Sequence, residues 1–248
     1  MNNIQPEIIF EDGDFAVINK PFGMVVNKAD SAKDSTVQEW AEKILQIANS
    51  HLPIADNSEF IRRGGIVHRL DKDTSGILLI AKNEDAFINL QKQFKDRVVH
   101  KKYLALVHGL VAPGAGVINA PIERNPFNRM RFGVFPGGRE AVTEYKTLTN
   151  YRNTKGETYS LLEVFPKTGR THQIRVHLKH LNHSIVSDVL YGGRKILKDD
   201  LKLVARMFLH AASIELHHPK TDNIIKFECE LPEVLAKALN NLQLITDN

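Results

Sequence analysis

Three absences narrow the possibilities for this 248-residue chain. Its single cysteine, Cys229, can form no intrachain disulfide and no cysteine metal cluster, which excludes disulfide-stapled folds and cysteine zinc sites. No apolar stretch approaches the roughly 18 residues of a membrane span. The first residues lack the basic start and apolar block of a signal peptide. Together these absences predict a cytoplasmic protein with no membrane partner.

Internal repeats, low-complexity tracts and linkers are also missing. The composition, with 42% hydrophobic and 25% charged residues, is that of an ordinary globular protein. A chain of this length can bury a sizeable core. We therefore expect one domain over residues 1–248.

Histidines gather in one stretch, but their spacing argues against a metal site. A helical zinc site uses two ligands four positions apart, and the HExxH motif is absent. The stretch offers neither arrangement, with His172, His177, His180 and His183 as its members. The sequence predicts no bound metal.

The net charge of +4 conceals an asymmetry along the chain. Residues 1–60 hold four Lys and Arg against ten Asp and Glu, a balance of −6, whereas residues 61–248 carry +10. A charged face is most often simply solvated, but a basic excess also favours an anionic partner such as nucleic acid.

The most distinctive stretch is a polar loop, His68–Gly76, which leads into the apolar run Ile77–Ala81. That run is too short for a typical helix, so it predicts a strand buried on both faces. A polar loop next to a core strand can hold a reactive group rigidly near solvent. Opposite charges crowd within the loop, and we expect its carboxylates to stay ionised. Asp71 is the first candidate for a catalytic residue.

The rest of the chain predicts a mixed α+β fold whose sheet is mainly antiparallel, because strands follow one another locally. Turn, cap and periodicity signals mark the elements. We expect a hairpin at Asp12-Gly13, helices at 36–48, from Asn83 or Asp85, at 171–181 and after Pro232, strands at 103–107, 141–148, 159–165, 185–186, 208–216 and 224–231, a loop at 49–59, a turn at 114–116 and a long irregular arm at 123–140.

The order of these pieces resembles the RluA/RluD-type family of RNA pseudouridine synthases. Three blocks carry the resemblance: IIFEDGDFAVINKPFGMVVNK, HRLDKDTSGILLIAKN and PKTGRTHQIRVHL. Weaker support comes from KKYLALVHG and MFLHAASIELHHP. The HRLD block is the most specific, and together the blocks span most of Ile8 to Pro232.

The resemblance implies the pseudouridine synthase catalytic fold, an RNA substrate (ribosomal RNA, transfer RNA or both) and an enzyme that uses no cofactor and acts as a monomer. Such an enzyme breaks the N1–C1′ bond of a uridine and rejoins the base through C5. By motif match the catalytic aspartate is Asp71. Tyr103 would lie against the base, Arg175 would pair with the catalytic carboxylate, and Leu209 would form an apolar wall.

Other expectations concern RNA contact. Arg69, beside the aspartate, would fill the space that an extruded uridine leaves or hold a phosphate. The arm at 123–140 mixes arginines with aromatic residues, a pattern that suits contact with RNA. Its candidate contacts are Arg124, Arg129 and Arg131.

The chain departs from the family pattern in three places. Few residues precede Ile8, so we expect no S4-type RNA-binding domain ahead of the first block. The stretch 41–59 is longer than expected. Ser187 begins Ser-Asp-Val-Leu-Tyr-Gly where Gly-Asp-x-x-Tyr-Gly is common.

Two other functions compete with catalysis on uridine. A relative could bind or remodel RNA without catalysis, although Asp71, Tyr103 and Arg175 are all retained. An aspartate-dependent hydrolase would need a metal or a second carboxylate, for which Asp73 is the neighbouring candidate. The chemical route also stays open between attack at C6, attack at C1′ and removal of a sugar proton.

Overall fold

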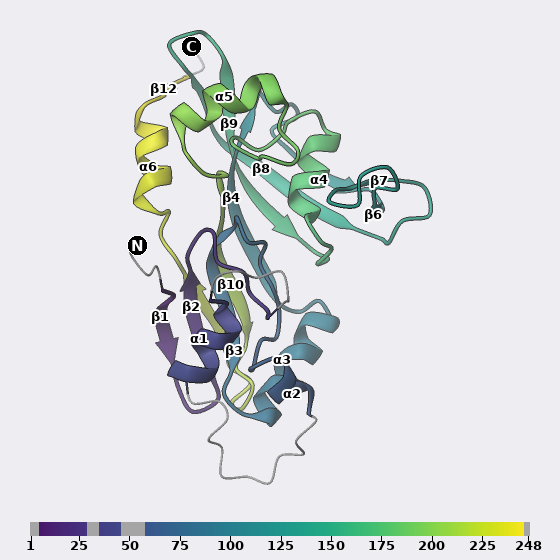
Figure 1. Cartoon of the computed structure of the whole chain (residues 1–248), viewed down its shortest axis with the longest axis vertical. Coiled ribbons are helices and arrows are strands. Elements are labelled where there is room, and N and C mark those ends of the chain that lie inside the picture. Colours follow the sequence, from purple (N-terminus) through teal and green to yellow (C-terminus); the bar gives the residue numbers. More distant parts are fainter. Residues whose placement is uncertain (1–4, 29–34, 46–57, 246–248) are drawn as a thin grey trace. The chain divides into compact units, whose positions relative to one another are not determined.

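The computed structural model describes residues 5–28, 35–45 and 58–245. They form two compact units, residues 1–100 with 213–229 and residues 101–212 with 230–248. Antiparallel strands flanked by helices build both units, which confirms the predicted α+β class (Figure 1). A single domain over the whole chain, without an S4-type domain, stays a prediction. None of the helices in the described ranges has the length and apolar character that crossing a membrane demands.

The first unit is built on a sheet whose inner strands are buried. Its strands follow the order β1-β2-β3-β10, to which β10 contributes from Ser213 onward, and β11 pairs antiparallel with the last five residues of β10. The strands are β1 (Glu7–Glu11), β2 (Phe15–Lys20), β3 (Ser75–Ala81), β10 (Leu209–His217) and β11 (Ile224–Glu228). Every residue of β3 is buried, as the apolar run predicted. The β1–β2 hairpin is confirmed at Asp12-Gly13, where the Asp12 carboxylate accepts hydrogen bonds from two backbone N–H groups.

The described residues of the first unit contain three helices, α1 (Val37–Ile44), α2 (Glu59–Arg62) and α3 (Glu84–Lys95). Thr36 caps α1 in a capping box with Glu39, and Asn83 caps α3; the sequence leaves Ser35 and Asp85 open as the alternative caps. The residues expected to extend α1 beyond 45, and most of the loop at 49–59, lie outside the described residues.

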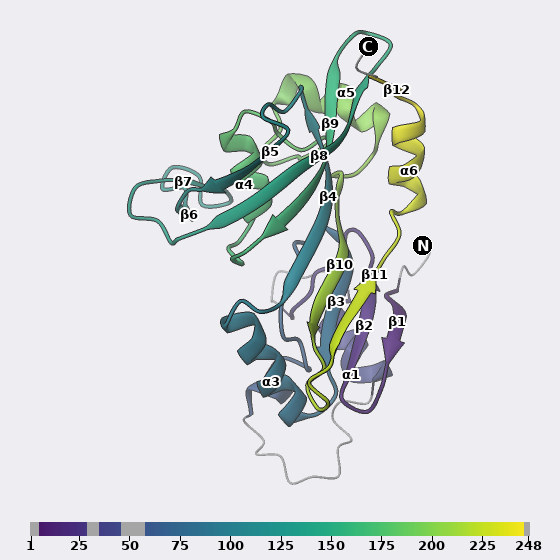
Figure 2. The same ribbon diagram turned by 180° about the vertical axis from the view of Figure 1, so that it is seen from behind.

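The second unit contains a second run of antiparallel strands. Their order is β4-β9-β8-β12, and β5 pairs with β8 (Figure 2). The strands are β4 (His100–His108), β5 (Ala115–Asn119), β8 (Val142–Arg152), β9 (Thr158–Pro166) and β12 (Gln243–Leu244). The predicted pairing of 141–148 with 159–165 is confirmed. The turn expected at 114–116 is wrong beyond Gly114, because Ala115 already begins β5. Gly116 belongs to the strand, where a Cβ would lie 2.7 Å from the Tyr145 hydroxyl.

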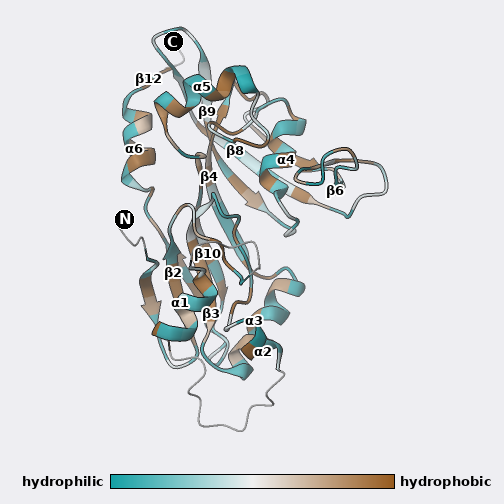
Figure 3. Ribbon diagram, in the orientation of Figure 1, coloured by the Kyte–Doolittle hydropathy of each residue, from teal (hydrophilic) through white to brown (hydrophobic). Residues whose placement is uncertain are grey.

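The second unit also carries α4 (Gln173–His180), α5 (Arg194–Leu203) and α6 (Glu233–Asn240). Helix α4 contacts β8 and β9, and six consecutive residues from Gln173 to Leu178 are buried. Helices α5 and α6 alternate between hydrophobic and hydrophilic residues (Figure 3). Helix α5 was not predicted, since its residues are mostly charged and its N-cap, Gly193, makes no side-chain cap.

The arm predicted to be irregular contains an ordered hairpin. Its strands β6 (Ile122–Arg124) and β7 (Phe132–Val134) pair with each other. Ile122 belongs to a buried cluster with Ala141, Val176 and Tyr191, and two residues of β7 pack against that cluster. The prediction failed because strands of three residues are too short to show an alternating pattern. The hairpin projects past α4 in both views (Figures 1 and 2).

Candidate active site

Asp71 lies at the start of a tight turn in the first unit. The Thr74 N–H donates to the Asp71 carbonyl at 3.1 Å, closing the turn over Lys72 and Asp73. Leu70 before the turn and Thr74 after it are buried, whereas Asp71 itself is half-buried. The turn is therefore anchored in the core at both ends while its first carboxylate reaches the surface. This is the rigid presentation that a catalytic side chain requires.

A buried lysine, which the sequence did not single out, braces the same turn. Lys20 has no exposed surface, and its ammonium donates to three carbonyls, those of Pro21 at 2.8 Å, Met24 at 2.9 Å and Lys72 at 3.1 Å. The Gly23 N–H also donates to the Lys72 carbonyl. The end of β2 and the Asp71 turn are thus held by one cation, because a buried ammonium needs several acceptors.

His68 fixes the entry to the loop. Its Nε2 accepts a hydrogen bond from the Leu79 N–H at 3.0 Å, and its ring stacks on Phe94 at 4.6 Å between centroids. Ile66 forms a bridge with Ile80 of β3. Arg69, by contrast, is exposed and stands two residues before Asp71. Arg69 and Asp71 therefore lie on the same loop, whose backbone is held by the contacts of His68 and Thr74.

The other candidate residues belong to the second unit and are buried. Tyr103 on β4 is 9% exposed and lies opposite Val164 of β9. Leu209, the first residue of β10, is 3% exposed. Whether they and Arg175 surround Asp71 stays a prediction.

Arg175 is buried in an ion pair. Its Nε and Nη2 donate to the two carboxylate oxygens of Asp188 at 2.7 and 2.8 Å, and both side chains are almost completely buried. An arginine on a helix is most often solvated, but Arg175 is buried because the Asp188 carboxylate compensates its charge. Its pairing with Asp71 stays a prediction. Asp188, which the sequence did not single out as a partner of Arg175, belongs to the Ser-Asp-Val-Leu-Tyr-Gly stretch that departs from the family pattern.

The backbone around Asp188 explains that motif. Asp188 Oδ1 also accepts from the N–H groups of Leu190 and Tyr191, and a Cβ on Gly192 would lie 2.7 Å from the Asp188 carbonyl. Ser187 adopts a positive φ of 59°, the conformation that favours the glycine common at this position. In this chain the Ser187 Oγ donates a hydrogen bond to the Val204 carbonyl. This hydrogen bond offsets part of the strain that a positive φ imposes on a serine.

Lys101, near the start of β4, has an altered pKa. Burial lowers the pKa of Lys101 from 10.5 to about 8. We expect the dimethylated Lys101 amine to titrate near pH 8 in ¹³C NMR of the reductively methylated protein, with Lys101→Arg assigning the signal. Between pH 8 and 10.5 the unfolded chain would hold a proton that the folded chain has lost, so the stability that burying this amine costs at lower pH is regained as pH rises through that range. Titration with the exposed lysines, near pH 10.5, would contradict the assignment.

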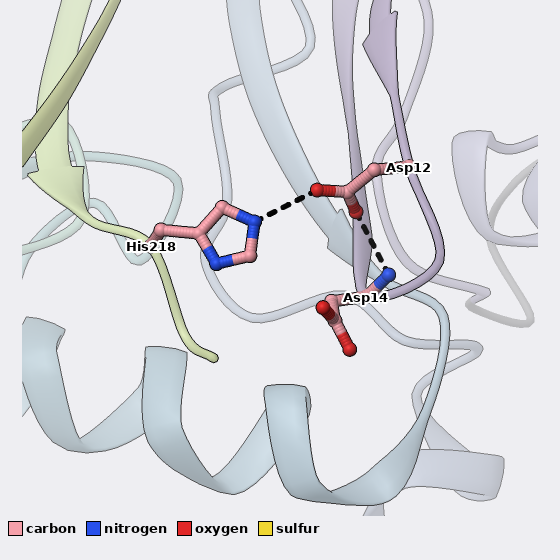
Figure 4. Close-up of side chains that lie close together, drawn as sticks. All are labelled: Asp12, Asp14 and His218. Carbon is pink, nitrogen blue, oxygen red and sulfur yellow. Dashed lines mark hydrogen bonds and ion pairs between the residues drawn. The ribbon is translucent and has the colours of Figure 1, made fainter. Parts of the chain in front are cut away.

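One cluster has the side chains of a metal site. Asp12, Asp14 and His218 bring one ligand atom each within 4.8 Å of one another (Figure 4). His218 Nδ1 accepts from the N–H groups of Lys220 and Thr221, so Nε2 carries the proton and donates to Asp12 at 2.9 Å. The hydrogen bonds join the β1–β2 turn to the turn after β10. The cluster therefore has a structural role, and no metal is inferred.

Comparison with known proteins adds independent evidence. Residues 14–180 match the family described as RNA pseudouridylate synthase. Uncharacterized RNA pseudouridine synthase YlyB of Bacillus subtilis (strain 168) is 38% identical over 96% of this chain and 73% of its own length. Ribosomal large subunit pseudouridine synthase D of Pseudomonas aeruginosa is 38% identical over 93% and 70%. The protein of the same name from Borreliella burgdorferi is 41% identical over 100% and 73%.

Solved structures agree. Human RNA Pseudouridylate Synthase Domain Containing 1 superposes with a TM-score of 0.73 at 26% identity, covering 98% of this chain and 89% of the other. Human RNA Pseudouridylate Synthase Domain Containing 4, at 24% identity, shares the fold with a TM-score of 0.70, over 97% and 94%. This chain therefore belongs to the RNA pseudouridylate synthase family, and it is an isomerase that converts uridine in RNA to pseudouridine.

Proposed function

We propose that this enzyme modifies specific uridines of large-subunit ribosomal RNA with Asp71 as its catalytic carboxylate, and that it needs neither metal nor cofactor. The observation that carries the proposal is the Asp71 turn, anchored in the core and braced by Lys20. The names of two relatives support the ribosomal substrate. The proposal includes a monomeric enzyme that meets its RNA in the cytoplasm.

The reaction explains why one carboxylate suffices. The N1–C1′ bond breaks, the base turns, a C5–C1′ bond forms, C5 loses a proton and N1 gains one. Atoms and electrons balance without a redox partner or a second substrate. The remaining demand is an ionised group beside an extruded nucleoside, whether it attacks C6 or C1′ or removes a sugar proton.

The other site residues receive supporting roles. Tyr103 offers a flat ring against which the target base stacks, and Leu209 lines the apolar side of the pocket. Arg175, oriented by its bidentate bonds to Asp188, stabilises the anionic form of Asp71. Arg69 occupies the space that the uridine leaves or holds a phosphate. Each role follows from the residue's chemistry and its match to the family motifs.

The choice of RNA can be tested in cells that lack this gene. Pseudouridines mapped across all RNA should disappear from defined positions of large-subunit ribosomal RNA, and the wild-type gene should restore them. Loss confined to transfer RNA would contradict the proposed substrate.

The hairpin supplies a prediction about affinity. Arg124, Arg129 and Arg131 are all exposed, but Arg124 also donates to the Arg129 carbonyl at 2.6 Å and covers the Phe132 ring at 4.9 Å. We propose that Arg129 and Arg131 hold phosphates and that Arg124, engaged within the hairpin, mainly stiffens it.

Replacing both Arg129 and Arg131 by alanine should weaken RNA binding and flatten its dependence on salt. Each lost phosphate contact removes about 0.7–0.9 from the slope of log K against log salt. Filter binding between 50 and 200 mM salt measures that slope. The exposed Lys195 and Lys198 of α5, replaced together by alanine, provide a control of equal charge. Equal slopes for the two double variants would show that Arg129 and Arg131 do not contact RNA phosphates.

A further inference from the structure

The tip of the β6–β7 hairpin, Asn125–Arg131, exposes an aromatic ring that the proposed reaction does not use. The Phe127 side chain is 95% exposed, more than any other large hydrophobic side chain in the described residues. Met130, in the same tip, is 71% exposed. A single exposed apolar residue is ordinary on a protein surface, so exposure alone assigns no role to Phe127.

The backbone that carries the ring is well defined by hydrogen bonds. The Asn125 Oδ1 accepts from the N–H groups of Phe127 at 2.8 Å and Asn128 at 3.0 Å. The Asn128 Oδ1 accepts from the Met130 N–H, and its carbonyl accepts from the Arg131 N–H. The Asn125 N–H closes the tip by donating to the Arg131 carbonyl at 2.9 Å. The ring is thus held on a preorganised turn, which lowers the entropy that binding would cost.

The base of the hairpin is attached to the body of the second unit. The Phe132 N–H donates to the Tyr191 hydroxyl at 2.9 Å, and that hydroxyl lies 2.9 Å from His172 Nδ1 at the start of α4. The Phe132 ring meets the His172 ring edge-on, with centroids 5.6 Å apart. A ligand that contacts the tip would therefore be held by a hairpin whose base is anchored to α4.

The charge of the hairpin indicates the partner. The hairpin, residues 122–134, contains three arginines and one acidic residue, Glu123, which lies in β6 and outside the tip. Arginine suits nucleic acid, because its planar guanidinium binds phosphates and also stacks on bases. An exposed aromatic ring among such arginines matches the way proteins bind single-stranded RNA, by stacking on bases whose faces are not covered by neighbours.

We propose that Phe127 stacks on an unpaired base of the RNA, at a position other than the uridine that is modified. The inference deepens the proposed function, since it names the kind of RNA feature that the hairpin selects. Arg129 and Arg131 supply salt-dependent affinity for the backbone, and Phe127 supplies a contribution that salt does not screen. The enzyme would then prefer substrates with an unpaired nucleotide within reach of the tip.

The test compares Phe127→Ala with the wild type on two RNA probes, a single-stranded 12-mer of mixed sequence and a 12-base-pair duplex. We expect Phe127→Ala to weaken binding of the single strand by about 5- to 150-fold, with an unchanged salt slope. Duplex binding should not change. Phe127→Trp should retain affinity, and Val117→Ala, at another exposed apolar residue on β5 (63%), should behave like the wild type.

Two results would overturn the inference. One is equal affinity of wild type and Phe127→Ala for the single strand. The other is a Phe127-dependent attachment to phosphatidylserine vesicles combined with unchanged RNA affinity, which would identify a membrane contact. Because Phe127 is exposed, Phe127→Ala should keep the wild-type melting temperature, so lost affinity would not reflect misfolding.

The same proteins separate this inference from the proposed function. If Phe127→Ala binds the single strand as tightly as the wild type and still forms pseudouridine in ribosomal RNA, only the inference about Phe127 is refuted. If binding of the single strand depends on Phe127 but the wild type modifies only transfer RNA, only the proposed ribosomal substrate is refuted.

Discussion

Replacing Asp71 by alanine is expected to abolish pseudouridine formation while leaving folding and RNA affinity nearly unchanged. The side chain is half-buried at the start of a turn whose hydrogen bonds, from Thr74 N–H and from Lys20, engage backbone carbonyls. Alanine keeps those carbonyls, so little packing is lost. The reaction, in contrast, has no other carboxylate assigned to it, and the expected loss is at least about a thousandfold in turnover, as for other essential catalytic groups.

Three measurements on the Asp71→Ala protein check this expectation. Pseudouridine content of ribosomal RNA after incubation reports turnover, filter binding reports affinity, and thermal unfolding followed by circular dichroism reports stability. An unfolded variant would contradict the expectation that the half-buried Asp71 side chain contributes little packing. A variant with wild-type turnover would exclude Asp71 as the catalytic residue, and a wild type that modifies no RNA would point to a protein that only binds it.

Replacing Asp188 by alanine is expected to produce the largest loss of stability. Asp188 accepts two hydrogen bonds from the buried Arg175 and two more from backbone N–H groups. Removing one partner of a buried ion pair typically costs about 3–5 kcal/mol in free energy of unfolding. Chemical denaturation of Asp188→Ala and the wild type measures the difference. Glu233→Gln, which breaks the exposed Glu233–Lys237 pair on α6, is the control and should leave stability unchanged.

A double-mutant cycle separates the pair from its parts. If the Arg175–Asp188 ion pair stabilises the fold, the double variant Arg175→Met with Asp188→Leu should lose less free energy of unfolding than the sum of the losses in the two single variants. Additive losses would show that the two charges act independently. Asp188→Ala should also impair turnover in protein that remains folded, because it frees the orientation of Arg175.

The sequence was sufficient where a signal is local. The Asp12-Gly13 hairpin, the Thr36 and Asn83 caps and the buried strand β3 depend on neighbouring residues, and all are confirmed. Motif blocks likewise identified the family, which the comparisons confirm. Asp71 was indicated both by its loop and by the HRLD block, whereas Tyr103, Arg175 and Leu209 were proposed by motif match alone.

The features that were missed depend on contacts between distant residues. A helical pattern alone counts Arg175 as a surface residue, and only Asp188 on a later turn makes its burial possible. Lys20 ends an apolar strand, and its three carbonyl acceptors become visible only when Met24 and Lys72 are folded around it. The β6–β7 hairpin is stabilised by packing on Val176 and Tyr191, far from it in sequence.

The central claim is that Asp71, and not its neighbour Asp73, performs the isomerisation. The most direct measurement is the release of tritium from ribosomal RNA labelled at C5 of uridine, because that hydrogen leaves only when C5 becomes bonded to the sugar. Asp71→Asn and Asp73→Asn each replace one carboxylate of the same turn by an amide, so they are matched variants. We expect Asp73→Asn to release tritium at close to the wild-type rate and Asp71→Asn to release none. Release by Asp71→Asn at the wild-type rate, or its loss only in Asp73→Asn, would contradict the account.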